Sequence, residues 1–464
     1  MILKIFFSLA VSFLTGYFCF SLIRKEKQLI TPILVNFIIS FAIGTGISSA
    51  LFFLWLLITG EARNFCTAEA VVVLILFFAV LARKKEVGLK KMFAADNFKS
   101  LFTGKTNIFF MLGIGVLVII NSLSFLFFFL NTPYGKTDAI NIWNLKARFF
   151  YLSSDYHWLN VFTNYSDLTH PDYPLLLPSY IARTWEYAGQ LNQAVPGVIA
   201  FLFTMLTVFL LVAAVRHLRG NINAMVAGIY LLISPSFIII GASQVADTVI
   251  GLYFLATTII LYLQKTTEKA QSLLVIAGLT AGFSAWTKNE GIIFILAVIV
   301  CRFLFFIPKD GLRKVGKDFL SFLYGLCPVL LPLILFKIYI APANDLFAAK
   351  NDLIPKVLDV ERYFLIIKVF VHEFLNYVFQ GFFPFLLLMI FVTVSGITGQ
   401  KEEKNIVTSC AQILLLMLFS YAAVYLISPH PLDWHLDTSA TRLLIQLYPS
   451  FLFILLVSAA PKKV

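Results

Sequence analysis

Ionisable side chains lie where apolar segments of this chain end, a position from which they can do chemistry at a membrane surface. Asp138 follows a phenylalanine-rich apolar segment and is the second residue of the stretch TDAINIWNLKARFFY, residues 137–151. Asp247 and Lys288 lie at the ends of other apolar segments, and Arg442 precedes the last one. Charged groups at the edge of a membrane bundle are costly unless they are paired or hydrated, so these residues are functional candidates.

The combination of one carboxylate with several cations suits the transfer of a group from a lipid-linked phosphate. The phosphate of a membrane-anchored donor pairs well with arginine or lysine, and Arg442 is our first candidate for this role and Lys288 the second. Asp138 would accept the proton of an attacking hydroxyl, as a general base in displacement at a sugar carbon. Such a reaction needs no nucleotide, so the absence of a P-loop or Rossmann pattern agrees with it.

Further residues on the same predicted side of the membrane are candidates for binding the donor phosphate or the substrate. A structural role is the alternative for each of them, because a histidine before a proline can hold a turn and a charged residue can close a helix end. These candidates are Lys146, Arg148, His170, Asp172, Tyr173, Asp247, Glu290 and His435.

Metal binding is the other chemistry that the long polar loop suggests. Asp138, His170 and Asp172 could together hold a divalent ion. Three such residues in one loop are more often hydrogen-bonded structure, so we predict no obligatory metal or cofactor and keep a divalent metal as the alternative. The five cysteines are scattered without metal-ligand spacing, which indicates neither a zinc site nor a disulfide framework.

The composition identifies the elements that must position these residues. Of 464 residues 60% are hydrophobic and only 13% are charged, which predicts an all-α polytopic membrane protein. The net charge of +12 does not indicate nucleic-acid binding, because the lysines and arginines lie between apolar segments rather than on one water-facing surface. They are expected to set the topology and to contact anionic membrane lipids.

A membrane span needs about 20 apolar residues, and this length predicts about 13 transmembrane helices. Their edges are uncertain by several residues. The predicted spans are 3–23, 31–59, 66–82, 108–130, 194–215, 223–241, 246–264, 271–286, 290–307, 319–340, 380–397, 406–428 and 443–460.

Orientation follows from the positive charges, because cytoplasmic loops collect lysine and arginine. Alternate loops, beginning with residues 24–28, hold most of the 36 lysines and arginines. The N-terminus is therefore predicted to be outside and the C-terminus inside. The first span carries its positive residues after it, unlike a cleaved signal peptide, and is expected to be retained. We expect a multi-pass protein of a bacterial inner or plasma membrane with its active site on the extracytoplasmic face.

Residues 131–193 form the longest predicted outer loop. A helix beginning at Asp138 would place Asn144 and Arg148 on one side and Trp143 and Phe150 on the other, as in an amphipathic helix at the membrane interface. A second such helix is predicted near residues 175–189, after a proline-rich turn. Simple anchoring at the head groups is the alternative role for these aromatic residues. Residues 359–380 are predicted to form a third interfacial helix.

Three regions follow from this pattern of spans and loops. The first holds three spans and a basic cytoplasmic loop, the second holds the core with the catalytic loop 131–193, and the third holds the last spans with outer loops 341–379 and 429–442. Their boundaries are 1–107, 108–340 and 341–464.

Five short motifs, in this order and on one predicted side, resemble the GT-C superfamily of polytopic glycosyltransferases. The nearest branch contains dolichyl-phosphate-mannose protein mannosyltransferases and bacterial aminoarabinose transferases. The resemblance covers about residues 108–460, and the three preceding spans depart from the family pattern. The motifs are KTDAINIW with Asp138, THPDYPLL with His170 and Asp172, QVADTVIG with Asp247, WTKNEG with Lys288 and Glu290, and TSATRLLIQLYP with Arg442.

The resemblance implies a membrane glycosyltransferase that moves a sugar, a hexose or a pentose, from a polyprenyl-phosphate donor with inversion, and with Asp138 as the base. The absence of a large soluble domain at the C-terminus favours transfer of a single sugar. The acceptor would be a hydroxyl of a glycan, lipid or protein, and no nucleic acid is expected as a partner. A secondary transporter or lipid flippase is the main alternative, supported by Lys337, Lys368, His372 and Glu373; an inactive partner subunit is another.

Overall fold

The computed structural model describes residues 1–24, 32–83, 105–165, 169–266, 271–343, 353–396 and 401–459. Within these residues the chain folds into helices and turns, with no β-strand, which confirms the predicted all-α fold. Several loops that carry the orientation signal, among them 84–104, lie outside the described residues, so the sidedness stays a prediction.

Every predicted span coincides with helical residues in the structure. A spanning segment must satisfy its backbone polar groups within itself, and this is why the long apolar runs become helices. The helices that make up these spans include α1 (Ile2–Ile23), α2 (Ile33–Thr59), α3 (Phe65–Ala82), α6 (Lys105–Asn131), α11 (Ala194–Leu232), α13 (Asp247–Thr266), α14 (Gln271–Thr287), α15 (Glu290–Val298), α17 (Leu312–Tyr339), α21 (Phe382–Ser395), α22 (Lys401–Ile427) and α23 (Leu432–Ser458).

The helices are divided differently from the predicted spans. α11 is 39 residues long and continues through the predicted loop 216–222, bending at Gly220, whose φ is 81°. Among the described residues ten helices are long and apolar enough to cross a membrane, or eleven if one bent pair counts as a single span. The bent pair consists of residues 360–378 and α21, with a bend of 82° between them. The segment 359–380, predicted to be an interfacial helix, is thus helical over most of its length. The number of crossings remains a prediction.

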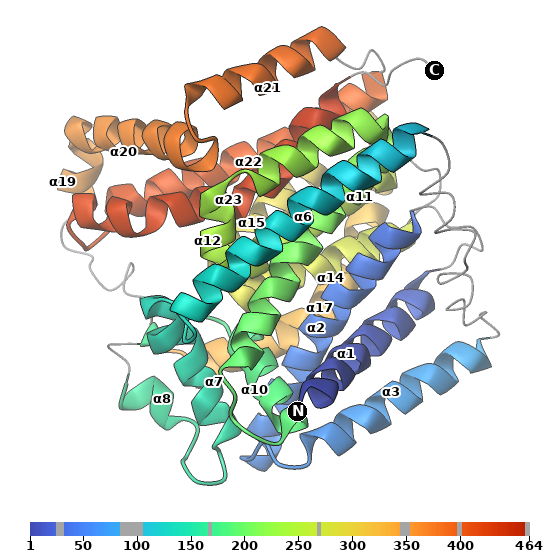
Figure 1. The fold of residues 1–464 in the computed structure, drawn as a ribbon, viewed down its shortest axis with the longest axis vertical. Coiled ribbons are helices and arrows are strands. Elements are labelled where there is room, and N and C mark those ends of the chain that lie inside the picture. Colours follow the sequence, from blue (N-terminus) through green and yellow to red (C-terminus); the bar gives the residue numbers. More distant parts are fainter. Residues whose placement is uncertain are drawn as a thin grey trace.

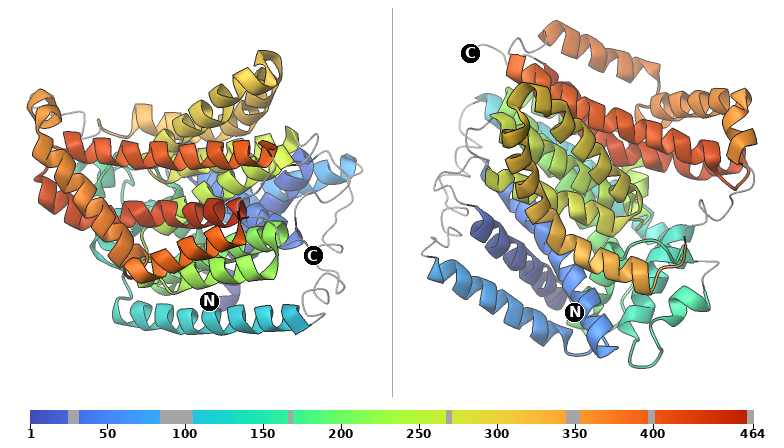
Figure 2. Two further views of the ribbon diagram at one scale, coloured as in Figure 1. Left: turned by 90° about the horizontal axis from the view of Figure 1, so that it is seen from above. Right: turned by 180° about the vertical axis from the view of Figure 1, so that it is seen from behind.

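α13 is the central helix of the bundle. All of its residues from Asp247 to Leu263 are buried, as expected of a helix that is apolar on every side. It packs against α11, α14 and α23. α6 and α17 lie on opposite faces of the bundle (Figures 1 and 2). The N-terminus of α13 therefore places Asp247 inside the protein.

The first two helices approach each other closely through small residues. A Cβ atom on Gly16 would lie 1.8 Å from the carbonyl oxygen of Ser40, and one on Gly44 would lie 1.8 Å from that of Ser12. The backbones of α1 and α2 are thus in direct contact, which is a common way for helices to associate in a membrane.

Short helices of the predicted outer loop gather at one end of the long helices, at the lower left of Figure 1. The helix expected from Asp138 begins as a π-helical turn, and it buries Trp143, Ala147 and Phe150 while leaving Arg148 exposed. These aromatic residues pack inside the protein, because α7 and α10 lie against each other. The elements are η1 (Ala139–Trp143), α7 (Asn144–Tyr151), α8 (Asn160–Thr163) and α10 (Leu176–Ala188).

A buried ion pair attaches α3 and α10 to each other. Nη2 of Arg183 lies 2.8 Å from Oε2 of Glu69, and both side chains are fully buried. The same guanidinium donates to the carbonyl oxygen of Ser8 in α1 at 3.0 Å, and the hydroxyl of Tyr187 donates to Glu69 at 2.8 Å. α1 and α3 are in this way connected to α10, a helix of the predicted outer loop.

We expect Arg183→Met to destabilise the protein by about 3–5 kcal/mol, because it leaves the buried carboxylate of Glu69 without its cation. The thermal midpoint in detergent, followed by size-exclusion chromatography, measures this loss. The double variant Glu69→Leu with Arg183→Met should recover most of the stability. A double variant as unstable as the single one would contradict this account of the pair.

Candidate functional site

Arg442 of α23 joins two carboxylates that lie far apart in the sequence. Its Nη1 donates to Oδ2 of Asp138 at 2.5 Å. Its Nε and Nη2 lie 3.0 and 2.9 Å from Oδ2 of Asp247. The planar guanidinium suits such simultaneous pairing, which a lysine could not reproduce.

The second oxygen of Asp247 is bound as well. Oδ1 of Asp247 accepts from Nζ of Lys288 at 3.0 Å and from Nε2 of Gln446 at 2.7 Å. Lys288 also pairs with Glu290 at 2.8 Å. Burial by itself would lower the pKa of Lys288, but the two carboxylates raise it above its usual value, so this lysine is charged. We call Asp138, Asp247, Lys288, Glu290 and Arg442 the ionic cluster.

Four separate segments supply the ionic cluster. Asp247 is the first residue of α13, where the positive end of the helix dipole favours a carboxylate. Lys288 and Glu290 come from the tight turn between α14 and α15, which requires Gly291 because a Cβ there would lie 2.1 Å from the backbone of Ser284. Asp138 follows Gly135, whose φ is 78° and whose missing side chain lets the turn approach Ser243.

The carboxylates of the ionic cluster differ in accessibility. The side chain of Asp138 is 35% exposed, that of Glu290 is 16% exposed, and that of Asp247 is fully buried. Asp138 is therefore the carboxylate that an external hydroxyl can reach most easily, whereas Asp247 can act only through its partners.

Tyr173 connects the turn after α8 to the ionic cluster. Its ring is stacked with those of Trp143 and His170, with centroid distances of 5.7 and 5.2 Å. Nζ of Lys288 lies 5.7 Å from the same ring. His170 has a φ of 42°, a strained value for a non-glycine residue, and the surrounding contacts hold it there.

Lys146 and Asp172 support this turn and are not members of the ionic cluster. Lys146 is fully buried, and its Nζ donates to the carbonyl oxygen of His170 at 2.8 Å. Oδ2 of Asp172 accepts from Asn289 at 2.7 Å, and Nζ of Lys337 donates to the carbonyl oxygen of Asp172 at 2.5 Å. The turn is thus fastened both to α7 and to the segment that carries Lys288.

Two other predicted site residues also lie apart from the ionic cluster. Arg148 is exposed, and its guanidinium lies 6.0 Å from the ring centroid of Tyr134. Nδ1 of His435 is hydrogen-bonded to the hydroxyl of Ser428 at 2.7 Å. The structure thus brings together Asp138, Asp247, Lys288, Glu290 and Arg442, with Tyr173 beside Lys288.

Gln446 and Tyr421 belong to the site although the sequence did not single them out. Gln446 is fully buried, binds Asp247, and accepts a hydrogen bond of 2.8 Å from the hydroxyl of Tyr421. The sequence could have indicated Gln446 by its spacing, because this polar residue lies one helical turn beyond Arg442 in an apolar segment.

The residues considered for a metal are engaged with other partners. Asp138 pairs with Arg442, and Asp172 binds Asn289. In the part of the chain that the structure describes, no group of three histidine, cysteine, aspartate or glutamate residues is arranged to hold a metal ion.

Lys146 generates a prediction about pH. Burial lowers its pKa from 10.5 to about 7, so the folded protein releases between these pH values a proton that the unfolded chain keeps. The charged Lys146 therefore lowers the stability of the folded protein by its full amount below pH 7, and this effect decreases as the pH rises toward 10. Lys146→Met should raise the thermal midpoint most at low pH, with Lys136→Met, an exposed lysine, as control. A shift that is independent of pH would contradict this explanation.

Part of the chain is similar to a known protein family. Residues 171–337 match the family model described as dolichyl-phosphate-mannose-protein mannosyltransferase. The matched residues include Asp247, Lys288 and Glu290, whereas Asp138 and Arg442 lie outside the match. No curated protein and no solved structure matches the chain significantly. The apolar helices identify the chain as a polytopic membrane protein, and over residues 171–337 it is similar to this mannosyltransferase family, which supports its assignment to the GT-C superfamily of glycosyltransferases.

Proposed function

We propose that this protein is a membrane glycosyltransferase that moves a single sugar from a polyprenyl-phosphate donor to a hydroxyl group of an acceptor, with inversion at the anomeric carbon. The observation that carries the proposal is the pairing of Arg442 with both Asp138 and Asp247, which puts a reachable carboxylate next to a cation. The acceptor is a glycan, a lipid or a protein, and the reaction takes place on the extracytoplasmic face.

Arg442 is the cation that the donor phosphate meets first. Its side chain is 25% exposed, whereas that of Lys288 is only 5% exposed. Asp247 holds both cations through its two oxygens and acts as a positioning residue, because its buried carboxylate cannot reach a substrate itself. The phosphate would bind to a guanidinium that is already fixed in orientation, which lowers the entropic cost of binding.

Donor binding would also prepare Asp138 for its role as general base. The Oδ2 of Asp138 that accepts the hydrogen bond from Arg442 is not available to a substrate hydroxyl as long as this bond exists. A donor phosphate that engages Arg442 competes with Asp138 for the same N–H groups and frees the carboxylate. The acceptor oxygen then forms its bond to the anomeric carbon, its proton passes to Asp138, and the polyprenyl phosphate leaves with the electrons of the broken bond.

Asp138→Asn tests the base, because the amide keeps the shape of the side chain but cannot take the proton. In membranes supplied with labelled polyprenyl-phosphate hexoses and pentoses, we expect kcat to fall by about 10²–10⁴-fold. Asp155→Asn, at an exposed position of the same loop, is the matched control and should keep the wild-type rate. Normal insertion together with unchanged transfer by the Asp138→Asn protein would show that Asp138 is not the base.

Arg442→Gln tests the phosphate contact. Loss of the charge-assisted pairing should raise the apparent KM for the donor about tenfold or more, while Arg442→Lys should be intermediate because it keeps the charge and loses the geometry. An unchanged donor KM would exclude Arg442 as the phosphate ligand. Transport or flipping by purified protein in liposomes, without any glycosidic product, would favour the transporter alternative over this proposal.

A further inference from the structure

Glu290 is the member of the ionic cluster to which the proposed reaction gives no role. Its Oε1 lies 2.8 Å from Nζ of Lys288, and its side chain is partly exposed. Glu290 is also the first residue of α15, where the positive end of the helix dipole favours a carboxylate. A purely structural function at this helix end is therefore the alternative to a part in the reaction.

The ionic cluster contains more carboxylates than cations. Asp138 pairs with Arg442 at one end, Glu290 pairs with Lys288 at the other end, and Asp247 lies between the two cations. Like charges repel strongly where little water is present. An additional anion such as a phosphate can therefore bind here only if it replaces one of the carboxylates beside a cation.

Lys288 and Arg442 are placed to share one anion. Nζ of Lys288 lies 3.0 Å from Oδ1 of Asp247, and Nη2 of Arg442 lies 2.9 Å from Oδ2 of the same carboxylate. Two cations that bridge a carboxylate are also close enough to bridge a phosphate, because both anions carry several oxygens on one central atom. A donor phosphate that engages Arg442 is thus near enough to engage Lys288 as well.

Lys288 cannot bind this phosphate as long as Glu290 pairs with it. The Lys288 side chain is almost fully buried, and its Nζ has Asp247 and Glu290 as partners, with the ring of Tyr173 at 5.7 Å. Of the two carboxylates, Asp247 is fully buried and Glu290 is the accessible one. A phosphate that reaches Lys288 would therefore displace Glu290 and leave Asp247 in place.

A displaced Glu290 would require a new hydrogen-bond donor. Its side chain is mostly buried, and a buried carboxylate without a partner is costly. The sugar of the donor is bonded directly to the phosphate, so the hydroxyl group beside the anomeric carbon would come close to Lys288 and Glu290. In glycoside hydrolysis, hydrogen bonds to this hydroxyl become stronger in the oxocarbenium-like transition state.

We propose that Glu290 exchanges its partner when the donor binds: Lys288 passes to the phosphate, and Glu290 accepts a hydrogen bond from the hydroxyl beside the anomeric carbon. Glu290 is then a specificity-determining residue that favours donors in which this hydroxyl is free. The proposal rests on the proposed function, because it takes the donor to be a polyprenyl-phosphate sugar. The exchange at Lys288 concerns the phosphate alone and can be tested without any transfer.

Isothermal titration of the full-length protein in detergent with undecaprenyl phosphate tests the exchange at Lys288. Glu290→Gln removes the competing charge, so we expect it to bind the lipid phosphate about tenfold more tightly than the wild type. Glu61→Gln, at an exposed position between α2 and α3, is the matched control and should bind as the wild type does. A lower thermal midpoint of Glu290→Gln without tighter binding would show that Glu290 is only structural and would overturn the proposal.

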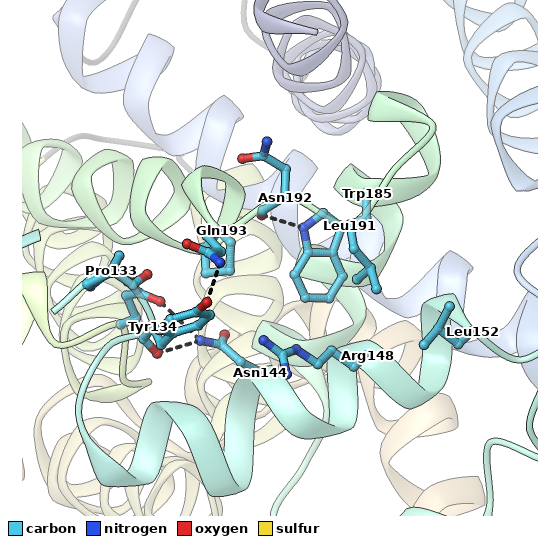
Figure 3. A pocket seen from close by; sticks show the side chains of 11 residues that line it. Pro133, Tyr134, Asn144, Arg148, Leu152, Trp185, Leu191, Asn192 and Gln193 are labelled. Atoms are coloured by element: carbon cyan, nitrogen blue, oxygen red, sulfur yellow. Dashed lines mark hydrogen bonds between the residues drawn. The ribbon is translucent and has the colours of Figure 1, made fainter. Parts of the chain in front are cut away.

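The pocket beside α7 is an alternative site for a phosphate. It has a volume of about 290 Å³, and Figure 3 shows Arg148 and Tyr134 among the side chains around it. The residues that line it in the described part of the chain include no member of the ionic cluster. Arg148→Gln should therefore leave the binding of undecaprenyl phosphate unchanged. If this variant loses the binding, the lipid phosphate occupies the pocket and the proposal fails.

Donors with and without the hydroxyl test the second half of the exchange. Suitable pairs of undecaprenyl-phosphate sugars are glucose with 2-deoxyglucose and arabinose with 2-deoxyribose. For the pair that the wild type uses, we expect kcat/KM to be at least about tenfold higher with the hydroxyl than without it. Glu290→Gln should reduce this ratio to about threefold or less, because a neutral amide accepts a weaker hydrogen bond than a carboxylate.

Two results of the transfer measurement would contradict the role of Glu290. One is a wild type that uses both members of a pair equally well, and the other is a Glu290→Gln protein that keeps the wild-type ratio. Glu61→Gln should keep that ratio, since its side chain lies outside the ionic cluster.

The two measurements distinguish failure of this proposal from failure of the proposed function. If no donor yields a product but Glu290→Gln still binds undecaprenyl phosphate more tightly, the proposed function fails while the exchange at Lys288 stands. Transfer that requires Asp138, together with unchanged binding by Glu290→Gln, would instead support the proposed function and reject the exchange.

Discussion

The buried carboxylate of Asp247 is the interaction on which the rest of the site depends. A fully buried carboxylate is tolerated only when both of its oxygens are paired, and here Arg442, Lys288 and Gln446 provide the partners. These partners come from α23 and from the turn between α14 and α15. Satisfying one charge at the end of α13 therefore fixes the relative positions of three helical segments in the centre of the bundle.

Arg442 extends this constraint outward to Asp138. Because its guanidinium is already bound to Asp247, the remaining N–H group has a defined direction, and Asp138 meets it at the start of the helix that follows α6. A charged network that is paired inside the protein and accessible at Asp138 and Arg442 is well suited to electrostatic catalysis. The proposed competition between a donor phosphate and Asp138 for one guanidinium would couple donor binding to the readiness of the base.

Much of the fold could be predicted from the sequence, because hydrophobic length is a strong signal in a membrane protein. All predicted spans coincide with helices, and the helices near Asp138, near residues 175–189 and within 359–380 exist. The site was harder to predict. Asp247, Lys288 and Arg442 were found because charges beside apolar segments are rare, whereas Gln446 is a neutral amide whose importance comes from its partners. Lys146 is the opposite case. Its charge suggested a phosphate ligand, whereas in the structure its Nζ donates to the carbonyl oxygen of His170.

The sequence by itself determined the membrane class, the helices, and the set of charged residues that could react, because each of these depends on local composition and spacing. Only the tertiary structure decided which of these residues meet. Asp138 and Arg442 are 304 positions apart, and no periodicity within either segment encodes their contact. That contact depends on how α6, α13 and α23 pack, and packing is a property of complete helix surfaces.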